Sequence, residues 1–423
     1  MNDKNLVRQG KMNLELAEKN MSALISLRAD FAKRKPFKGL RIGMALHVTK
    51  ETGVLVRTLK DAGAEVAITS CNPLSAQNDI VAALQNEGIK VYGHKGETHA
   101  EYYSFIKKVL EIKPNITIDD GCDLITELHT HRKDLLKNMI GGCEETTTGI
   151  LRLKAMEKDK VLACPIVAVN DNDTKHLMDN YYGTGQSTLD GIIRASNVLF
   201  AGKTVVVAGY GDCGKGVALR SKGHGSMVIV TEVNPFRALQ AKMDGFEVMP
   251  MSDAAPLGDI FITVTGDCDV IRPEHVRKMK SGALLANSGH FDVEIDVAGI
   301  KKISSRVRRM RPFLDEYTLG GSRGGAGKSA GGKVIYIAAE GRLVNLAAAE
   351  GHPSDVMSMS FCGQALAVEY LLKNKGKLAN RVYTLPPAID EKISRLQLTS
   401  MGVKIDKLTE KQQKYLSSWQ EGT

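Results

Sequence analysis

The sequence predicts an α/β chain with two doubly wound parallel-sheet domains and a short helical C-terminal tail. Short apolar runs alternate with helical segments through most of the 423 residues, which is the pattern of parallel β-α-β units. A glycine-rich turn at 205–216 lies nearly halfway along the chain, so a complete sheet layer precedes it. We expect a front domain over 1–184, completed by 351–385, a second domain over 185–350, and a tail over 386–423.

The elements of each domain follow from local sequence patterns. After a charged N-terminal helix, helices are expected from about Thr49, from near Ser75 and over AEYYSFIKKVLEI. Residues 320–332 are rich in glycine and are expected to be a flexible excursion between two extended segments. Thr409 and Gln412 have capping-box spacing in the tail. Strands are predicted at RIGMALHV, EVAITSC, KVYG, NITIDDG and CPIVAVN in the front sheet, and at KTVVVAG, SMVIVTE, FEVMP, DIFITVTG and ALLANSG in the second.

The composition argues against several classes of protein. The N-terminus lacks the apolar core of a signal peptide and no apolar run is long enough to span a bilayer, so we expect a cytoplasmic protein without membrane contact. The closest cysteines, Cys122, Cys143 and Cys164, stand 21 residues apart, so we expect neither a disulfide framework nor a metal site. The net charge of +9 is densest in KKISSRVRRMR, but no aromatic residue or recognition motif accompanies it, so no nucleic-acid partner is expected.

A dinucleotide-binding fingerprint stands at the start of the second domain. Gly209, Gly211 and Gly214 form G-x-G-x-x-G between an apolar strand and a helical segment. The first glycine permits the tight turn, the second lets a pyrophosphate approach, and the third lets helix and strand pack closely. Glu232 ends the next strand, where its carboxylate can accept hydrogen bonds from an adenosine ribose and would repel a 2′-phosphate. The pattern predicts a Rossmann-like domain that binds NAD, with Asp212 beside the glycines.

Polar side chains gather where the predicted front strands end. His47 and Thr49 follow the first strand, and Asp120 follows another. Ligands of open parallel sheets bind outside the carboxyl ends of the strands, so these residues are expected to line one cleft. Lys175 and Asp179 are four residues apart and would share a face if their segment is helical.

Seven motifs occur in order along the chain: CNPLSAQND, EETTTG, TKHLMDNYYG, VVVAGYGDCGKG, NSGHFDVEID, EGRLVNLA and GHPSDVMSMSF. Together they closely resemble the S-adenosylhomocysteine hydrolase family, from about residue 40 to 415. The resemblance implies reversible hydrolysis of S-adenosyl-L-homocysteine, a by-product of methyl transfer, by a homotetramer with tightly bound NAD. The ribose 3′-hydroxyl is oxidised transiently, the ketone acidifies the 4′ C–H, homocysteine leaves, water adds and the hydride returns.

The resemblance also implies a role for each matching residue. Lys175 would be the base for the 3′-hydroxyl, provided that burial or a neighbouring cation lowers its pKa. Asp120 would handle the 4′ proton, and His47 the water and the leaving group. The implied catalytic set is Lys175, Asp179, Asp120, His47 and His290, and the substrate is held by Thr49, Glu51, Asp120, Glu145, Lys175, Asp179 and His352. The implied cofactor set is Thr146, Thr147, Thr148, Asn180, Gly209, Gly211, Asp212, Gly214, Glu232, Asn287 and Asn345.

Several alternatives remain open from the sequence. In the family Glu51 accepts from the exocyclic amine of adenine, which favours adenosine, but an S-inosylhomocysteine hydrolase with the same chemistry is the first alternative. A plain NAD-dependent dehydrogenase with His290 as acid and base would release NADH, and a nucleoside sensor would have lost the chemistry. Thr184 stands where many members have cysteine. The lysine and tyrosine extension of some members is not found, so the tail is expected to serve oligomerisation.

Overall fold

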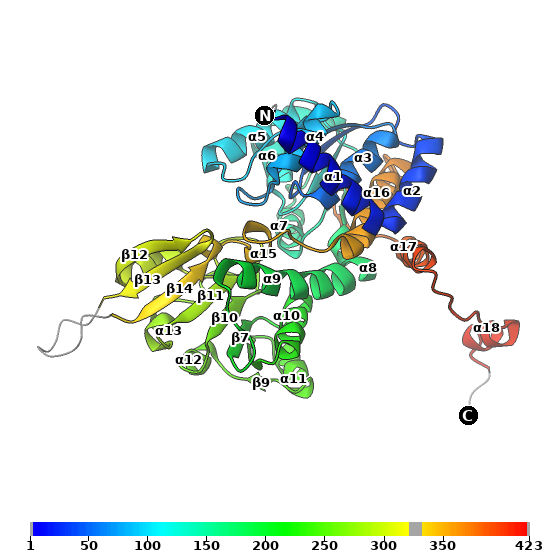
Figure 1. Cartoon of the computed structure of the whole chain (residues 1–423). Helices are drawn as coiled ribbons and strands as arrows, with labels where there is room; N and C mark the ends of the chain where they lie inside the picture. Colours follow the sequence, from blue (N-terminus) through cyan, green and yellow to red (C-terminus); the bar gives the residue numbers. More distant parts are fainter. Residues whose placement is uncertain (1–2, 321–331, 421–423) are drawn as a thin grey trace, which may run out of the picture.

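The structure is a computed structural model that describes residues 3–320 and 332–420, and it contains two sheets with helices on both faces (Figure 1). The strands of the first sheet are β1 (Arg41–Ala45), β2 (Glu65–Thr69), β3 (Lys90–Val91), β4 (Ile116–Asp119), β5 (Gly141–Glu144), β6 (Ile166–Ala168) and β15 (Val382–Tyr383). All seven are parallel, in the order β15-β6-β5-β4-β1-β2-β3. The predicted α/β class with a doubly wound front layer is confirmed.

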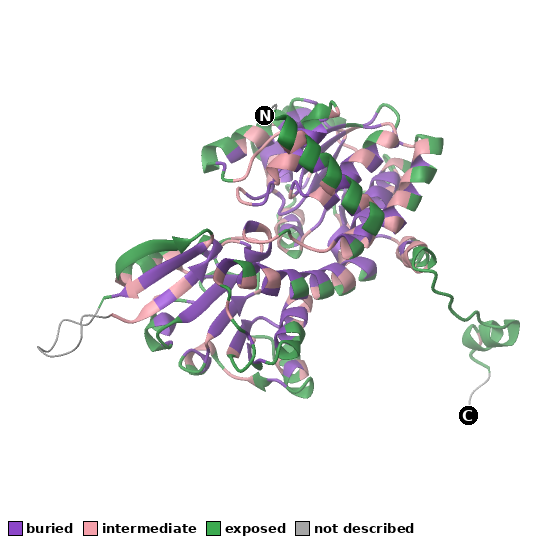
Figure 2. Cartoon of the chain, in the orientation of Figure 1, coloured by how far each residue is buried: buried purple, intermediate pink, exposed green. Residues whose placement is uncertain are grey.

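The second sheet has eight strands in the order β12-β13-β14-β11-β10-β7-β8-β9. Their bounds are β7 (Thr204–Ala208), β8 (Met227–Thr231), β9 (Glu247–Val248), β10 (Ile260–Thr263), β11 (Ala283–Asn287), β12 (Ser304–Arg311), β13 (Leu314–Leu319) and β14 (Val334–Ala338). The strands from β14 to β9 are parallel, whereas β12 and β13 form an antiparallel hairpin at the edge. The sequence did not predict this hairpin, because β12 is almost wholly exposed and its charged sequence lacks apolar alternation (Figure 2). The predicted glycine-rich excursion lies, except for its two ends, outside the described residues.

Helices cover both sheets. Those beside the first sheet are α1 (Lys4–Asn20), α2 (Ser22–Arg34), α3 (Lys50–Asp61), α4 (Asn78–Asn86), α5 (His99–Leu110), α6 (Asp123–Thr130), α7 (Thr147–Lys158) and α16 (Ser354–Lys373), with the short turns η1 (Lys133–Asn138) and η2 (Val169–Asp171). Those beside the second are α9 (Thr184–Ser196), α10 (Asp212–Gly223), α11 (Pro235–Met243), α12 (Met251–Ala254), α13 (Pro273–Lys278), α14 (Val297–Ile303) and α15 (Val344–Ala347), with the turn η4 (Ala339–Gly341). Where the sequence predicted one N-terminal helix, the structure has two, α1 and α2, which are separated by Met21.

Burial on both faces explains the continuous apolar runs of the strands. In β7, Val205 and Val207 belong to one hydrophobic cluster, and Val206 belongs to the cluster on the opposite face. The first sheet is likewise packed between two clusters, one of which contains Ile42 and the other Ala45. A parallel sheet covered on both sides has no solvated face, so polar alternation disappears from its sequence. This is the arrangement of a doubly wound fold.

Each sheet has a point where the strand order reverses, and these two points position the site. In the first sheet the reversal lies between β1 and β4, and in the second between β7 and β10. The loops after these strands carry His47, Asp120, Gly209 and Thr265, and all four line one cavity. In open α/β sheets ligands bind at such reversals, outside the carboxyl ends of the strands.

The tail contains α17 (Pro387–Ser400), which packs on α16 and α2, and α18 (Glu410–Leu416), which extends away from both sheets (Figure 1). The predicted capping box is confirmed: the Thr409 hydroxyl accepts from the Gln412 N–H, and the Gln412 side chain accepts from the Thr409 N–H. Most of the tail is exposed (Figure 2), and the Trp419 side chain is 91% accessible. Over residues 3–320 and 332–420, no helix combines the length and apolarity needed to cross a bilayer.

Candidate functional site

A cavity of about 1360 Å³ lies between the carboxyl ends of the two sheets. Nearly all residues that the sequence singled out line it, and they come from both sheets. They are His47, Thr49, Glu51, Asp120, Glu145, Thr146, Thr147, Thr148, Lys175, Asp179, Asn180, Gly209, Gly211, Asp212, Glu232, His290, Asn345 and His352. Gly214 and Asn287 do not line the cavity.

The fingerprint glycines form a turn that leaves room for a phosphate group. Gly209 has φ +103°, a conformation that a side chain would strain. A Cβ on Gly211 would meet only the tip of Arg237, at 3.7 Å, so its backbone is open toward the cavity. A Cβ on Gly214 would lie 2.0 Å from the Gly209 carbonyl oxygen, which explains why this third glycine serves packing and lies outside the cavity. The turn leads into α10, and the free N–H groups at the N-terminus of such a helix can bind a phosphate.

Glu232 is fixed at the end of β8 by three backbone donors. Its carboxylate accepts hydrogen bonds from the N–H groups of Tyr210 at 2.7 Å, Val233 at 2.7 Å and Asn234 at 2.9 Å. An ionised carboxylate has about four acceptor positions, so capacity remains for ribose hydroxyls. Asp212 pairs with His176, whose Nδ1 lies 3.0 Å from Asp212 Oδ2. That hydrogen bond raises the pKa of His176.

Asn345 and Asn287, both predicted to lie at the nicotinamide end of NAD, make different hydrogen bonds. Asn345 Nδ2 donates to Ser187 Oγ at 3.2 Å, while its buried Oδ1 has no partner among the described residues. A free amide oxygen in the cavity wall suits a carboxamide donor, so the residues fit the nicotinamide of NAD. Asn287 instead accepts from Thr263 Oγ1 and donates to the Gly341 carbonyl, and its side chain is fully buried. It stabilises the loop after β11 rather than reaching the cavity.

Lys175 lies where a short helix changes its winding. Residues Asp173–Lys175 form α8, and the π-helix η3 (His176–Gly183) follows. Lys175 Nζ lies 3.1 Å from Asp179 Oδ2, four residues further along the chain. Because a π turn pairs residues five apart, Lys175 Nζ also donates to Asn180 Oδ1 at 2.8 Å. Lys175 Nζ also lies 3.6 Å from Glu145 Oε1. The π-helix thus directs three polar side chains toward one point of the cavity.

The electrostatics of this cluster favour the charged forms of lysine and aspartate. Burial disfavours the Lys175 ammonium, but Asp179 and Glu145 outweigh that effect and raise the pKa of Lys175. This is opposite to the lowering that a base at neutral pH requires. Although burial opposes it, Lys175 and His352 hold the pKa of Asp179 well below its usual range. In the protein alone, Lys175 is therefore a cation.

Glu145 is anchored by two donors from α16 that the sequence analysis did not identify. The Ser360 hydroxyl and the Gln364 amide both donate to the Glu145 carboxylate. The two donors are four residues apart on one buried face of the helix, and this spacing within GHPSDVMSMSFCGQ was the available signal. Burial raises the pKa of Glu145 despite the attraction of Lys175.

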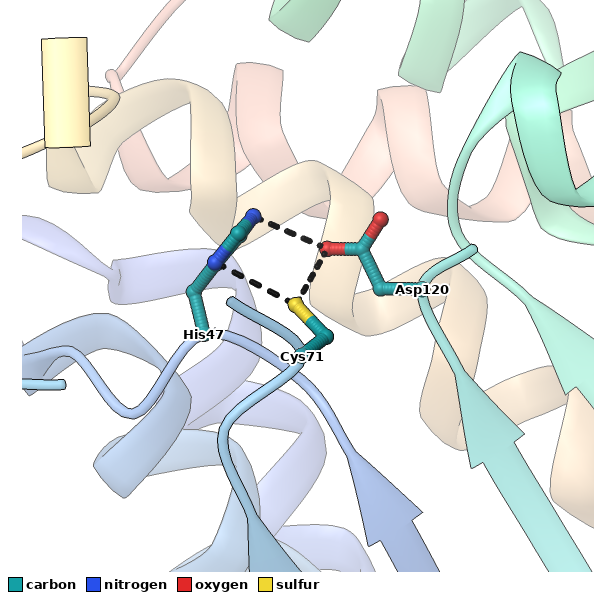
Figure 3. Close-up of side chains that lie close together, drawn as sticks. All are labelled: His47, Cys71 and Asp120. Carbon is teal, nitrogen blue, oxygen red and sulfur yellow. Dashed lines mark hydrogen bonds and ion pairs between the residues drawn. The ribbon is translucent and has the colours of Figure 1, made fainter. Parts of the chain in front are cut away.

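His47 and Asp120 meet across the end of the first sheet, together with Cys71 (Figure 3). His47 Nε2 lies 3.4 Å from Asp120 Oδ2, and His290 Nδ1 lies 3.7 Å from Asp120 Oδ1. Burial lowers the pKa of His47 to about 4 against the attraction of Asp120, so the ring is neutral at pH 7. A neutral imidazole beside a carboxylate can accept or deliver a proton.

Thr49 and Glu51 begin α3 and face a segment far away in sequence. Thr49 caps the helix by accepting from the Thr52 N–H. Glu51 is 1% exposed, accepts from Ser354 Oγ at 2.7 Å, and its Oε1 lies 3.4 Å from Lys50 Nζ. Its carboxylate therefore forms a hydrogen-bond acceptor in the wall of the cavity.

His352 connects the cluster to the start of α16. Its Nδ1 bonds to Asp179 Oδ1, and its Nε2 lies 3.3 Å from the Thr184 hydroxyl. Gly183 permits this approach, because a Cβ there would lie 3.0 Å from the His352 ring. His352 thus joins η3 to the loop that precedes α16.

A dinucleotide cradle that faces a buried lysine, carboxylate and histidine cluster defines an NAD-dependent enzyme with a small-molecule substrate. The family model S-adenosyl-L-homocysteine hydrolase matches residues 1–135, and its NAD binding domain model matches 180–351. The chain is 56% identical over 421 residues to the S-inosyl-L-homocysteine hydrolase of Methanocaldococcus jannaschii, which covers 100% of this chain and 99% of the relative. It is 54% identical over 422 residues to the adenosylhomocysteinase of Saccharolobus solfataricus, with 100% and 99% covered.

A further relative, the S-inosyl-L-homocysteine hydrolase of Methanococcus maripaludis, is 52% identical over 421 residues, with 100% of this chain and 99% of the relative covered. The chain belongs to the S-adenosyl-L-homocysteine hydrolase family, and it is an NAD-dependent hydrolase. The predicted family and the predicted cofactor are confirmed.

Proposed function

We propose that this enzyme hydrolyses S-adenosyl-L-homocysteine reversibly to adenosine and L-homocysteine through a transient 3′-keto sugar. The observation that carries this proposal is the contact of Lys175 with both Asp179 and Glu145 in the wall of the cavity that the glycine cradle also lines. Two carboxylates can accept from the vicinal hydroxyls of a ribose, while the lysine reaches the hydroxyl that is oxidised. This site would remove a by-product of methyl transfer.

The oxidation is assigned to Lys175. NAD, which the glycine cradle and Glu232 would hold, would supply reversible hydride acceptance at the 3′ carbon, and its positive charge would disfavour an ammonium nearby. Lys175 takes the hydroxyl proton from a position held by Asp179 and Asn180. Glu145, fixed by α16, holds the ribose, and Thr146, Thr147 and Thr148 line the neighbouring cavity wall. His352 supports the lysine cluster through Asp179.

The elimination is assigned to the cluster around Asp120. The ketone acidifies the 4′ C–H, and Asp120 takes that proton. Neutral His47, 3.4 Å away, then relays this proton from Asp120 to the departing homocysteine sulfur. Later His47 takes a proton from the attacking water and passes it through Asp120 back to the 4′ carbon. His290, 3.7 Å from Asp120, limits the access of bulk water to this end of the cavity.

The second point of the proposal is which purine the substrate carries. Glu51 presents a carboxylate acceptor, which suits the exocyclic amine of adenine and would repel the carbonyl of hypoxanthine. The same chemistry on S-inosyl-L-homocysteine is the second candidate, and the 56% identical relative from Methanocaldococcus jannaschii favours it, since that protein is an S-inosyl-L-homocysteine hydrolase. Adenosine remains the proposed nucleoside.

We also propose a substrate-binding domain over 1–184 completed by 351–385, an NAD-binding domain over 185–350, and an oligomerisation tail over 386–423 in a homotetramer. The parallel pairing of β15 with β6 supports the return of the chain to the front domain. Tyr415, Leu416 and Trp419 are more than half exposed, and such apolar side chains support a tail that packs on another subunit.

Two measurements test this proposal: the identity of the bound cofactor and the rate at which each nucleoside is consumed. Mass spectrometry of purified enzyme is expected to find bound NAD, and incubation with homocysteine is expected to consume adenosine much faster than inosine. Enzyme stripped of NAD should lose thioether synthesis and regain it when NAD is restored. Faster consumption of inosine would favour the second candidate, and thioether synthesis without NAD would contradict the proposed chemistry.

A further inference from the structure

Two neighbouring loops of the front domain contact the second domain beside the cavity. One loop follows β2 and carries Leu74, and the other follows β3 and carries Lys95. The Leu74 side chain packs against the hydrophobic cluster of the second domain that contains Ala347. Lys95 Nζ donates to the Ala347 carbonyl oxygen at 2.7 Å, at the end of α15, and lies 4.9 Å from the centroid of the Phe313 ring. No step of the proposed reaction uses Leu74 or Lys95.

The contact of Lys95 with the second domain offsets an energetic cost. Burial lowers the pKa of Lys95, because removal from water disfavours its ammonium group. The Ala347 carbonyl and the face of the Phe313 ring both attract a cation and offset part of this cost. Both partners belong to the second domain, so these favourable contacts exist only while the two domains lie against each other.

Hydrogen bonds join the two loops of the front domain to each other. The Gly96 N–H donates to the Pro73 carbonyl oxygen at 2.8 Å, and the Lys95 N–H donates to Asn78 Oδ1 at 2.9 Å. These bonds flank Leu74 on one loop and include Lys95 on the other. A displacement of Lys95 is therefore passed on to the loop that carries Leu74.

The loop that carries Leu74 also positions His47. Ser75, the next residue, places its Oγ 2.8 Å from His47 Nδ1, and the other ring nitrogen, Nε2, lies 3.4 Å from Asp120 Oδ2. A hydrogen bond of this kind fixes the orientation of a functional side chain. The place of the loop thus determines whether His47 can exchange a proton with Asp120.

On the second domain, the contact falls on the helix that carries Asn345. Ala347 ends α15, two residues after Asn345, and Figure 1 shows this short helix where the two halves of the molecule meet. The Asn345 Oδ1 atom, which has no partner among the described residues, fits the carboxamide of the nicotinamide. The Lys95 contact therefore links the residue that fits the nicotinamide to the loop that orients His47.

We propose that Lys95 and Leu74 are positioning residues that hold the His47 loop and α15 in fixed relative positions, so that elimination follows oxidation before the 3′-keto nucleoside leaves. This inference rests on the proposed function, which assigns oxidation to the nicotinamide side of the cavity and elimination to the His47 side. In the oxidation the 3′ carbon gives a hydride to NAD and the hydroxyl gives a proton to Lys175. If the ketone then leaves the cavity, the hydride cannot return to it, and the enzyme keeps NADH.

The structural test is amide hydrogen exchange of the NAD-loaded enzyme without substrate, measured by mass spectrometry of its peptides. Lys95→Met keeps the length of the side chain but removes the donor and the charge, so exchange should become about fivefold faster or more in both 71–78 and 343–348. Lys95→Arg keeps a cationic donor and should retain slow exchange. Lys60→Met is the matched control, because Lys60 Nζ also donates to a backbone carbonyl, that of Glu87 at 2.7 Å, but within the front domain. It should exchange like wild type.

The kinetic test measures how often the intermediate escapes. Each enzyme is incubated with adenosine and homocysteine and then separated from small molecules by gel filtration. The absorbance of the NADH that it retains is divided by the number of turnovers. Lys95→Met should begin with the same NAD content as wild type and Lys60→Met but retain about tenfold more NADH per turnover, with 3′-keto nucleoside in the filtrate. A variant that is merely less stable would lose activity without raising this ratio.

Exchange in Lys95→Met that stays slow, or that becomes faster only in the loop around Lys95, overturns the coupling of the two segments. Faster exchange in both segments without additional NADH overturns the role in retaining the intermediate. If Lys95→Met fails to fold, Leu74→Ala replaces it, because that variant removes only the apolar contact and should affect the same two segments. If wild type does not reduce NAD with adenosine, the proposed function fails, whereas the exchange measurement still decides the coupling.

Discussion

The Lys175 ammonium lies 3.1 Å from the Asp179 carboxylate although both side chains are almost fully buried. Desolvation makes a buried ion pair costly unless further hydrogen bonds satisfy it. Here Asn180 accepts from the lysine and His352 bonds to the aspartate. The energy that holds this pair charged also has to be overcome when Lys175 gives up its proton, so the pair controls both the stability and the reactivity of the site.

Replacing Lys175 with methionine tests its assignment as base. Lys175→Met keeps the length of the side chain but removes the proton acceptor, so bound NAD should remain while its reduction by adenosine falls by about 10³-fold or more. The measurement is the absorbance of NADH after mixing with adenosine, together with the NAD content of the protein. Reduction at the normal rate would contradict the assignment.

Lys154→Met is the matched control. Lys154 also contacts a carboxylate, with Nζ 3.6 Å from Asp171 Oδ2, but its side chain is more than half exposed. An exposed ion pair contributes little to stability. The control should therefore retain both NAD and its rate of reduction.

The preference for adenine over hypoxanthine depends on Glu51. Glu51→Gln replaces an acceptor with an amide that can also donate, so the preference for adenosine over inosine should narrow by about tenfold, since a hydrogen bond to a charged group contributes about 1.5–3 kcal/mol. The measurement is the ratio of kcat/KM for the two nucleosides with homocysteine. Glu350→Gln, which removes another carboxylate that contacts Lys50 on the surface, should leave the ratio unchanged. An unchanged ratio in Glu51→Gln would mean that this carboxylate does not face the base.

Most strands could be predicted because burial on both faces makes them continuous apolar runs, but β5 could not. Its sequence, GGCE, has low strand propensity. Glycine is required there because a Cβ on Gly141 would lie 2.7 Å from the Pro165 carbonyl oxygen, and one on Gly142 would lie 2.6 Å from Thr117 Oγ1. Tertiary packing, which no local pattern reports, sets these two positions.

The candidate site was predicted where its residues follow strands or repeat a known motif. The four-residue spacing of Lys175 and Asp179 anticipated their contact, but the π-helix that also brings Asn180 to the lysine has no simple sequence signal. Ser360 and Gln364 were missed because they reach Glu145 across 215 and 219 residues of chain. The catalytic roles themselves stay predictions until the variants are measured.

Glu97 makes the stability of the front domain depend on pH. Its side chain is 5% exposed, and one carboxylate oxygen has no partner among the described residues. Burial raises the pKa of Glu97 to about 7, against a hydrogen bond from the His94 N–H. The folded state thus holds this proton more tightly than the unfolded state. The contribution of Glu97 to the free energy of unfolding is therefore fully present below pH 4.5 and is lost as the pH rises through about 7.

Glu97→Gln should remove this loss of stability at high pH, because the glutamine amide has nearly the same shape as the carboxyl group and cannot ionise. We expect the variant to be more stable than wild type at pH 8 by about 1–2 kcal/mol, allowing for partial access of solvent, and equally stable at pH 4. Thermal unfolding at both values measures the difference. Glu111→Gln, at an exposed position just after α5, should show none. A Glu97→Gln variant that gains nothing at pH 8 would show that Glu97 ionises freely in the folded protein.

Gly149 in α7 is expected to control the loops that carry Asp120 and Thr146. Glu144 Oε1 accepts from the N–H groups of Gly121 at 2.9 Å and Thr146 at 3.0 Å, and a Cβ on Gly149 would lie 2.2 Å from this carboxylate. Gly149→Ala should therefore lower kcat and the NAD retained after gel filtration at least tenfold, although alanine favours a helix by about 1 kcal/mol. The matched variant Gly223→Ala, at the end of α10 where a Cβ meets no atom within 4 Å, should keep both values. Equal kcat and NAD content in the two variants would mean that Glu144 can move without disturbing the site.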